Sequence, residues 1–390
     1  MSLALTARQL FTPIELVEDP LLFIEDGTIT DVTTRSAKEV PAGTRMLDFP
    51  DAVLAPGFID IHIHGAAGHD VMEAGSAALP ALEGFLAQHG VTSYYPTTVT
   101  APLDTILAAL DRLGAAIDAA AALAEANRAR PLGIHLEGPF ISHVRRGVHP
   151  PADLLQPNFA IFERMWQAAH GQIKIITIAP ELPGAPELIA EAARRGICVS
   201  LGHSDAQLDA TCRGIAAGAR HATHTFNAMR PLGHRDPGIL GVALADSRLS
   251  ADIIADGIHV DPLVVDLFLR AKGQDGAVLI TDAMAATGMP DGKYRLGSLD
   301  VEVSRGHCTA GTTLAGSVLT LDRAVRNVMQ FANWNLRSAV QLATWNPARV
   351  VRQHEHRGML AAGKAADLVV LTPGGEVRAT IVNGRFPASS

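Results

Sequence analysis

The sequence predicts an α/β fold: a closed (β/α)₈ barrel of the TIM type, with a small β-sandwich domain formed by both ends of the chain. Two observations predict the barrel. From Val53 onward, apolar runs rich in β-branched residues alternate with helical stretches rich in Ala and Leu, and there are eight such runs. A third observation predicts the small domain, because both chain ends carry short alternating runs and turn signals in place of helices.

The eight candidate strands are short, apolar and rich in β-branched residues. They are Phe58–His64, Val91–Val99, Gly133–Glu137, Ile173–Ala179, Cys198–His203, Ala222–Phe226, Ser250–Ile254 and Ala277–Asp282. Strands that alternate with helices form parallel βαβ units, and eight units predict a closed barrel. An open doubly wound sheet is the alternative on pattern alone.

Segments with helical periodicity lie between these strands. They include Pro80–His89, Leu103–Arg128, Pro186–Arg195, Ala206–Ala217 and Pro262–Ala271. Four of them are followed by a glycine at the position where helices commonly end: Gly90, Gly196, Gly218 and Gly273.

The chain ends predict the second domain. Leu21–Glu25 and Thr28–Val32 flank an Asp26-Gly27 hairpin signal. Two further short strands are predicted near the other end, Ala366–Leu371 and Ala379–Val382, with a turn at Asn383-Gly384. We therefore expect residues 1–54 and 358–390 to form the β-sandwich domain and residues 55–357 to form the barrel.

Composition excludes several classes of protein. The 390 residues are 48% hydrophobic, which provides for one large core or two modest ones, and no run of about 18 apolar residues predicts a membrane span. The net charge of −8 argues against a nucleic-acid partner. Three widely spaced cysteines predict neither a disulfide framework nor a cysteine zinc site. The first residues lack a basic stretch followed by an apolar region, which predicts a cytoplasmic protein.

The strongest local signal is a His-x-His pair, His62 and His64, at the end of the first barrel strand. Residues two apart on a strand face the same side, and barrel active sites lie at the carboxyl ends of the strands. The two imidazoles can therefore share one metal ion. The alternative is a pair of partly buried histidines that bond to the backbone.

Other strand ends carry further candidate ligands: Glu137, His203, His224 and Asp282. A buried carboxylate needs a cation or a set of donors nearby, and a divalent metal supplies that partner. Nitrogen and oxygen ligands without thiolate favour zinc, although manganese, iron and cobalt also accept them. Taken singly, His135, His221 and His224 have an alternative role as barrel-filling side chains, and Asp282 as a cap of the next turn.

A metal at this place predicts hydrolysis. A bound metal lowers the pKa of its water from about 15.7 to about 7 and polarises a carbonyl oxygen. A carboxylate on the open side of the metal can then take a proton from the water and deliver it to the leaving group, and Asp282 is the candidate for that role.

These residues together resemble the amidohydrolase superfamily, and within it the deacetylases of N-acetylated sugar phosphates. The resemblance covers nearly the whole chain and rests on eight segments: Pro56–Gly65, His135–Pro139, Gly147–Pro150, Leu201–Ser204, His224–Met229, Ala255–Val260, Thr281–Ala283 and Gly363–Leu371. It implies that Glu137, His203 and His224 bind the principal zinc ion and that Asp282 is the general acid and base. Many members bridge two metals with a carboxylated lysine, whereas here Glu137 stands in that region.

The resemblance also implies the metal count and the substrate contacts. Some relatives have Gln and Asn in place of His62 and His64 and use one metal, so two histidines allow a second. His149 would donate to the carbonyl oxygen or the sugar, and His259 would hold the sugar or the phosphate. The remaining contacts are to phosphate: Asn227, the Ala228 backbone, and Arg235, which would reach the active site of the neighbouring subunit of a homodimer.

The implied reaction is hydrolysis of the acetamide of N-acetylglucosamine 6-phosphate to glucosamine 6-phosphate and acetate. Ligand motifs do not distinguish sugar epimers, so N-acetylgalactosamine 6-phosphate is an alternative substrate. A cyclic-amide hydrolase is disfavoured because the lysine motif is missing. A non-catalytic scaffold of the same fold is disfavoured because the ligand residues are retained.

Overall fold

The computed structural model describes residues 2–73, 75, 77–122 and 128–386. Residues 123–127 at the end of the predicted helix Leu103–Arg128 lie outside this part of the chain. The same holds for Met1 and for residues 387–390 of the predicted β domain.

Eight parallel strands form the barrel, each close to its predicted position. They are β6 (Phe58–Ile63), β9 (Val91–Thr98), β11 (Ile134–Glu137), β12 (Ile173–Ile178), β13 (Cys198–Leu201), β14 (His221–Ala222), β15 (Ser250–Ile254) and β16 (Ala277–Ile280). The short β10 (Arg130–Pro131) adds to the edge of β9. Strand β14 is shorter than predicted because the backbone leaves the sheet after Ala222 and becomes left-handed at His224.

The barrel closes between β6 and the end of β16. The Asp282 N–H donates to the carbonyl oxygen of His62 at 2.9 Å, and the His64 N–H donates to that of Ala283 at 2.8 Å. On its other edge, β6 pairs with β9. The predicted closed barrel is therefore confirmed, and the open doubly wound sheet is excluded.

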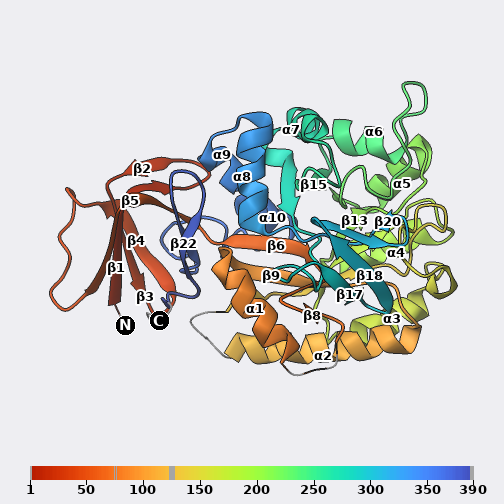
Figure 1. Cartoon of the computed structure of the whole chain (residues 1–390), viewed down its shortest axis with the longest axis horizontal. Coiled ribbons are helices and arrows are strands. Elements are labelled where there is room, and N and C mark those ends of the chain that lie inside the picture. The colour runs from red at the N-terminus through yellow and green to blue at the C-terminus, as the bar shows by residue number, and fades with distance from the viewer. Residues whose placement is uncertain (1, 74, 76, 123–127, 387–390) are drawn as a thin grey trace.

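Helices cover the outside of the barrel (Figure 1). The five predicted helices correspond to α1 (Ala78–Gln88), α2 (Leu103–Ala122), α4 (Ala185–Arg194), α5 (Leu208–Ala217) and α7 (Pro262–Gly276). The four glycines expected at helix ends all have positive φ, and Gly273 breaks the helical backbone inside α7. Five further helices were not among those predicted: α3 (Phe159–Ala168), α6 (Gly238–Ala245), α8 (Leu321–Ala332), α9 (Leu336–Gln341) and α10 (Trp345–Val350).

A seven-stranded sheet beside the barrel combines both ends of the chain, as Figure 1 shows at its left. Its strands are β1 (Ser2–Phe11), β2 (Leu16–Glu18), β3 (Pro20–Glu25), β4 (Thr28–Thr34), β5 (Arg45–Pro56), β21 (Leu368–Leu371) and β22 (Val377–Ile381). The Asp26-Gly27 hairpin joins β3 to β4, and both turn residues have positive φ as a tight hairpin requires. The small β domain from both ends is thus present, while the domain boundaries after residues 54 and 357 stay a prediction.

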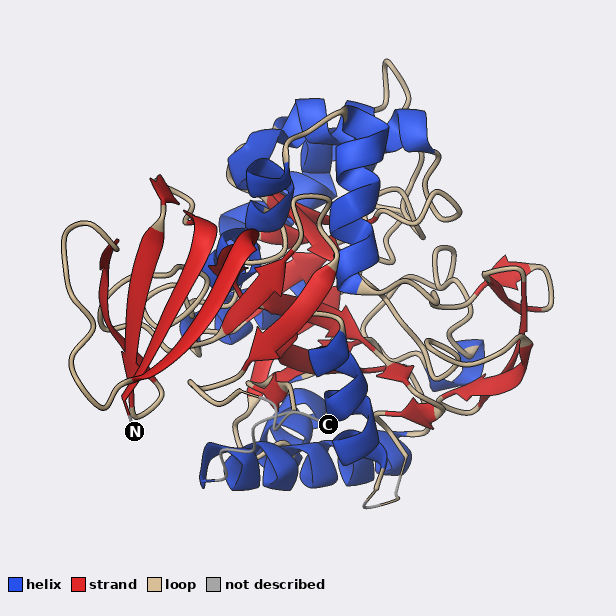
Figure 2. Cartoon of the chain, turned by 60° about the vertical axis from the view of Figure 1, so that its left-hand side comes forward, coloured by secondary structure: helices blue, strands red, loops and turns tan. Residues whose placement is uncertain are grey.

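A four-stranded antiparallel sheet follows the last barrel strand and was not predicted. It comprises β17 (Gly292–Leu296), β18 (Leu299–Ser304), β19 (His307–Ala310) and β20 (Thr313–Leu314), and Figure 2 shows it at the right of the molecule. Asp70 ties it to the loop after β6, because its Oδ2 accepts the Gly297 N–H at 2.7 Å. Within the described residues, no helix is both long enough and apolar enough to span a bilayer.

Candidate metal centre

The predicted ligands come together at the carboxyl end of the barrel. Glu137 ends β11, whereas His203, His224 and Asp282 each lie two residues beyond the end of their strand. These last three residues have left-handed backbones, with φ of 46°, 29° and 50°. Such a conformation costs about 1–3 kcal/mol for a residue other than glycine and is concentrated at functional sites.

Glu137 is the centre of the cluster. Its Oε1 lies 3.0 Å from His224 Nε2, 3.2 Å from His203 Nε2 and 3.5 Å from His62 Nε2. Its Oε2 lies 3.4 Å from His64 Nε2. One carboxylate therefore contacts four imidazoles.

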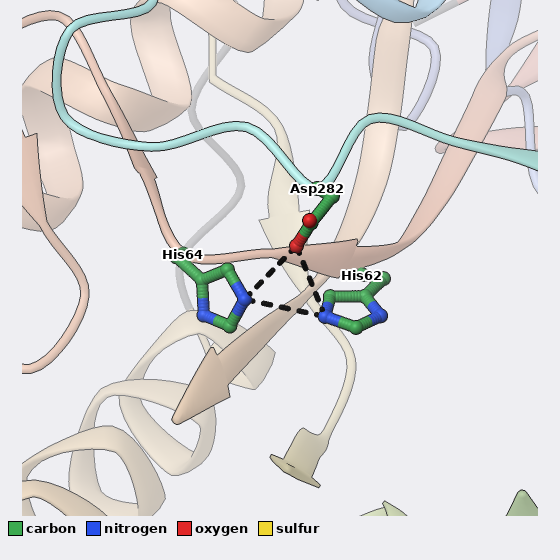
Figure 3. A group of neighbouring side chains, drawn as sticks. All are labelled: His62, His64 and Asp282. Carbon is green, nitrogen blue, oxygen red and sulfur yellow. Dashed lines mark hydrogen bonds and ion pairs between the residues drawn. The ribbon is translucent and has the colours of Figure 1, made fainter. Parts of the chain in front are cut away.

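The set on the β6 side is His62, His64 and Asp282 (Figure 3). The two Nε2 atoms are 3.2 Å apart, and Asp282 Oδ1 lies 3.0 Å from that of His64 and 3.3 Å from that of His62. Asp282 thus lies among the candidate metal ligands.

Hydrogen bonds to the backbone orient two of the histidines in a way that fits a divalent cation. His64 Nδ1 lies 2.9 Å from the Thr97 carbonyl oxygen, and His203 Nδ1 lies 3.0 Å from that of Arg145. A carbonyl oxygen only accepts, so each Nδ1 carries a proton and Nε2 is the nitrogen that faces the cluster. Imidazole Nε2 atoms beside two carboxylates are the donor set that a metal such as zinc takes.

Both carboxylates of the cluster are ionised. Burial alone would raise the pKa of Glu137, but the neighbouring histidines, with His62 foremost, outweigh it and hold the pKa well below its ordinary value. The same balance lowers the pKa of Asp282, through His62 and His64. For His224, burial is outweighed by the hydrogen bond and the charge of Glu137, which raise its pKa to about 9.

His149 differs from the other histidines because it presents a donor. Its Nδ1 accepts the Thr100 backbone N–H at 3.2 Å, so the neutral ring carries its proton on Nε2. That Nε2 lies 3.6 Å from Glu137 Oε2. His149 is therefore arranged to donate a hydrogen bond into the site.

Two buried carboxylates form hydrogen bonds with the backbone of candidate ligands, and the sequence did not predict this role for them. Asp252 accepts the backbone N–H of His224 in a short hydrogen bond and lies 2.9 Å from His221 Nε2. Asp60 accepts from Thr281 Oγ1 at 2.6 Å and from the His62 N–H at 3.3 Å, and burial raises its pKa to about 6. The sequence feature that could have identified both residues is an acidic residue within an otherwise apolar strand.

The two other histidines on barrel strands are held by the barrel interior. His135 Nδ1 bonds to the Ile61 carbonyl oxygen and its Nε2 to Thr177 Oγ1. His221 bonds to Ser250 and Asp252. Both rings use both nitrogens, which fits the barrel-filling alternative for these two residues but not for His224.

The predicted substrate residues lie on loops beyond the same strand ends. The Asn227 Nδ2 is buried without a hydrogen-bond partner among the described residues. Ala228 has a left-handed backbone and its carbonyl oxygen accepts the Ser204 N–H. His259 Nδ1 is held by Asp256 Oδ2 at 2.7 Å.

Arg235 lies apart from the cluster. It is exposed at the tip of a turn in which the backbones of Gly233 and Asp236 bond to each other. Asp236 pairs with Arg230, and Arg235 has no hydrogen bond or ion pair in the part of the chain described. The structure therefore brings Arg235 to no other predicted site residue of its own chain.

Comparisons with known proteins agree with this geometry. The sequence profile of the Amidohydrolase family matches residues 53–386. The chain is 38% identical to the N-acetylglucosamine-6-phosphate deacetylase of Bacillus subtilis (strain 168), over 99% of this chain and 97% of that protein. It is 36% identical to the N-acetylgalactosamine-6-phosphate deacetylase of Escherichia coli O157:H7, over 99% of each.

A solved structure supports the fold over its full length. It is a variant of the N-acetyl-D-glucosamine-6-phosphate deacetylase of Mycobacterium smegmatis in complex with N-acetyl-D-glucosamine-6-phosphate, and it matches with a TM-score of 0.91 and 34% identity over 100% of both chains. The barrel, the ligand cluster and these similarities lead to one conclusion: the chain belongs to the amidohydrolase family.

Proposed function

We propose that this protein hydrolyses the acetamide of N-acetylglucosamine 6-phosphate, releasing acetate and glucosamine 6-phosphate. The observation that carries the proposal is the position of Glu137, whose Oε1 lies within 3.5 Å of the Nε2 atoms of His62, His203 and His224 and whose Oε2 lies 3.4 Å from that of His64. The full-length similarity to a deacetylase of this substrate supports the choice of amide.

Zinc is the metal we propose, held by Glu137, His203 and His224. A bound divalent cation lowers the pKa of a coordinated water to about 7 and polarises the amide carbonyl. His62, His64 and Asp282 form a second donor set that shares Glu137, so we propose room for a second ion there.

The protein's own side chains supply the proton transfers. Asp282 is ionised, so it takes a proton from the attacking water and then donates it to the departing amine nitrogen. His149 Nε2–H donates to the carbonyl oxygen as negative charge develops on it. The amide C–N bond breaks, and the proton from Asp282 leaves with the amine.

The phosphate end of the substrate would be held by donors on the loops after β14 and β15. We assign the Asn227 amide, the Ala228 backbone and His259 to this role, and propose that Arg235 reaches the phosphate in the neighbouring subunit of a homodimer. An unpartnered guanidinium at an exposed tip supports a contact outside its own chain, and a guanidinium holds phosphate through paired charge-assisted bonds. We propose a cytoplasmic location, where phosphorylated sugars occur.

The test is acetate release by the purified protein. N-acetylglucosamine 6-phosphate should be cleaved, the unphosphorylated sugar should be cleaved far more slowly, and a chelator should stop the reaction until zinc is restored. Equal rates for the two sugars would reject the phosphate assignment. A chain that releases no acetate with any metal would be a scaffold.

N-acetylgalactosamine 6-phosphate is a second candidate substrate, because a deacetylase of that sugar is 36% identical over 99% of the chain. Kinetics on both epimers side by side would decide. We expect the larger kcat/KM for the gluco epimer, and the reverse order would reassign the substrate.

A further inference from the structure

We propose that a cavity at the amino end of the barrel binds a small dianion, either free phosphate or the phosphate group of a phosphorylated metabolite. The cavity has a volume of about 280 Å³. Cys198 and Ser250, the first residues of β13 and β15, line it. His203 lies five residues further along the chain from Cys198, which at about 3.3 Å per strand residue separates the cavity from the metal centre by roughly 16 Å. The phosphate site proposed in this cavity does not depend on the deacetylase function proposed above.

Four arginines line the cavity: Arg220, Arg248, Arg349 and Arg352. Two of them are held in place. Arg220 Nη1 donates to the carbonyl oxygens of Ile215 at 2.8 Å and Ala219 at 2.6 Å. Arg248 donates to Asp246 through Nε and Nη2. Each fixed guanidinium keeps further N–H groups for a ligand, so part of the site is already organised.

The other two guanidinium groups have no assigned partner. The side chains of Arg349 and Arg352 form no hydrogen bond or ion pair with any residue that the structure describes, although the Arg352 backbone N–H donates to the Arg349 carbonyl oxygen at 3.1 Å. Arg352 also follows the end of α10 with φ of 56°, at the position where helices favour glycine. A left-handed backbone is unfavourable for a residue that has a side chain. A charged side chain therefore occupies position 352 although the backbone conformation there is unfavourable for it.

Positive charge dominates around the cavity. Asp275 is the acidic residue of the lining, and its Oδ1 already accepts from Gln341 Nε2 at 2.8 Å. Asp246, outside the lining, is paired with Arg248. Lys272 adds a further cation nearby, since its Nζ donates to the Asp246 and Leu249 carbonyl oxygens. In a chain of net charge −8, this concentration of guanidinium groups favours an anion, and arginine forks match phosphate geometry.

The test is calorimetric titration of the full-length protein with inorganic phosphate, against chloride at matched ionic strength. Hydrogen bonds between guanidinium groups and phosphate are charge-assisted and strong, so the double variant Arg349→Ala/Arg352→Ala should bind phosphate at least about 10-fold more weakly. Arg352→Lys should fall between. Arg213→Ala, which removes an exposed arginine of α5 that has no partner among the described residues, should bind like the wild type.

Phosphate could also enter the proposed active site, so Arg235→Ala is titrated in parallel. We expect the site lost in the double variant to persist in Arg235→Ala. If the double variant retains the full phosphate response, or if only Arg235→Ala loses it, the proposal is wrong. Glucose 6-phosphate, which has no acetamide, is the second probe: binding that the double variant weakens would identify phosphorylated metabolites as ligands, and binding of phosphate alone would identify the free ion.

Discussion

The surroundings of Asp282 determine both the charge of its carboxylate and its access to a substrate. Its Oδ1 faces the Nε2 atoms of His62 and His64, and its side chain keeps 12% of its surface exposed. The exposed part leaves room for contact with a substrate, while the histidines keep the carboxylate ionised. An ionised and partly accessible carboxylate is what the first proton transfer needs.

Asp282→Asn should lower kcat by about 100- to 10,000-fold, because an amide cannot take up the proton. Glu137, His203 and His224 are unchanged, so zinc measured by elemental analysis should remain in the purified variant. Turnover close to wild type would remove Asp282 from the mechanism.

Asp252 should act on the metal through His224. Asp252→Ala removes the acceptor of the His224 N–H, so the left-handed backbone at His224 is no longer held in place. The affinity for zinc should therefore fall about 10- to 100-fold, as it does when other residues that orient metal ligands are replaced. Competition with a chromophoric chelator measures this affinity. Asp252→Asn keeps an acceptor oxygen and is the control. An affinity unchanged in the alanine variant would make Asp252 a barrel-filling residue only.

For single residues, the sequence predicted which side chains come together but not which hydrogen bonds orient them. The spacing of His62 and His64 on one strand already implies a shared face. The tautomer of His149, by contrast, depends on a backbone N–H at Thr100, which lies 49 positions away in the chain. A contact of that kind exists only in the folded barrel, so no local pattern contains it.

Gly65 lies just beyond the end of β6, where the surrounding backbone leaves no space for a side chain. A Cβ at this position would lie 2.3 Å from the His69 carbonyl oxygen and 2.9 Å from the Ala285 nitrogen, both backbone atoms. Gly65→Ala should cost about 1–3 kcal/mol and lower the melting temperature by several degrees. Gly84→Ala is the control, because no atom lies within 4 Å of the added Cβ on α1 and a helical alanine stabilises. Equal melting temperatures for the two variants would refute the packing argument.

Helices α1 and α8 are joined by a hydrogen bond between His89 and the Asp322 carboxylate, which predicts a pH dependence. Asp322 on α8 lies 3.1 Å from His89 Nδ1 at the end of α1 and 2.8 Å from Arg326 Nη1. Burial alone would raise the pKa of Asp322, but its hydrogen bonds, with His89 foremost, outweigh it and hold the pKa well below its ordinary value near 3.8. The stabilisation is therefore present above about pH 4 and is lost as the pH falls below it.

Asp322→Asn should lower stability at pH 7 by about 1–2 kcal/mol, since both partners are partly exposed. The difference in melting temperature from the wild type should shrink as the pH is lowered from 5 to 3. Asp104→Asn, which removes an exposed acid from the first turn of α2, serves as the control for the helix dipole. A difference that is the same at both pH values would contradict the ion-pair account.

Element positions followed from the sequence where hydrophobic periodicity was strong. All eight barrel strands were found, yet β14 was predicted to reach Phe226 because its apolar and β-branched residues continue beyond Ala222. Tertiary constraints at His224 end the strand earlier. The sheet from β17 to β20 was missed because its strands are short and mostly polar on their exposed face.

At the scale of the whole molecule, the proposed homodimer predicts complementation between inactive variants. Arg235→Ala should raise KM for the phosphosugar more than it lowers kcat, whereas Asp282→Asn removes kcat. When the two proteins are mixed and allowed to exchange subunits, a heterodimer regains one complete site if Arg235 acts across the interface. At a substrate concentration far below the KM of the Arg235→Ala variant, activity should then approach roughly a quarter of the wild-type value. No recovery after verified exchange would place Arg235 outside the neighbouring site.

The global architecture was predictable because eight βα units and strand-like chain ends leave few topologies. The pairing of β5 with β1 and β21 joins the two ends in one sheet, as the end patterns predicted. The arrangement of the arginines at the amino end of the barrel was not predictable, since Arg220, Arg248 and Arg352 come from separate loops that only the closed barrel brings together.

The most direct test is a crystal structure of the zinc-loaded protein with anomalous diffraction at the zinc edge. The account predicts a peak about 2.0–2.2 Å from a Glu137 oxygen and from the Nε2 atoms of His203 and His224. A peak bound elsewhere, or no peak at this position in crystals of active protein, would contradict it.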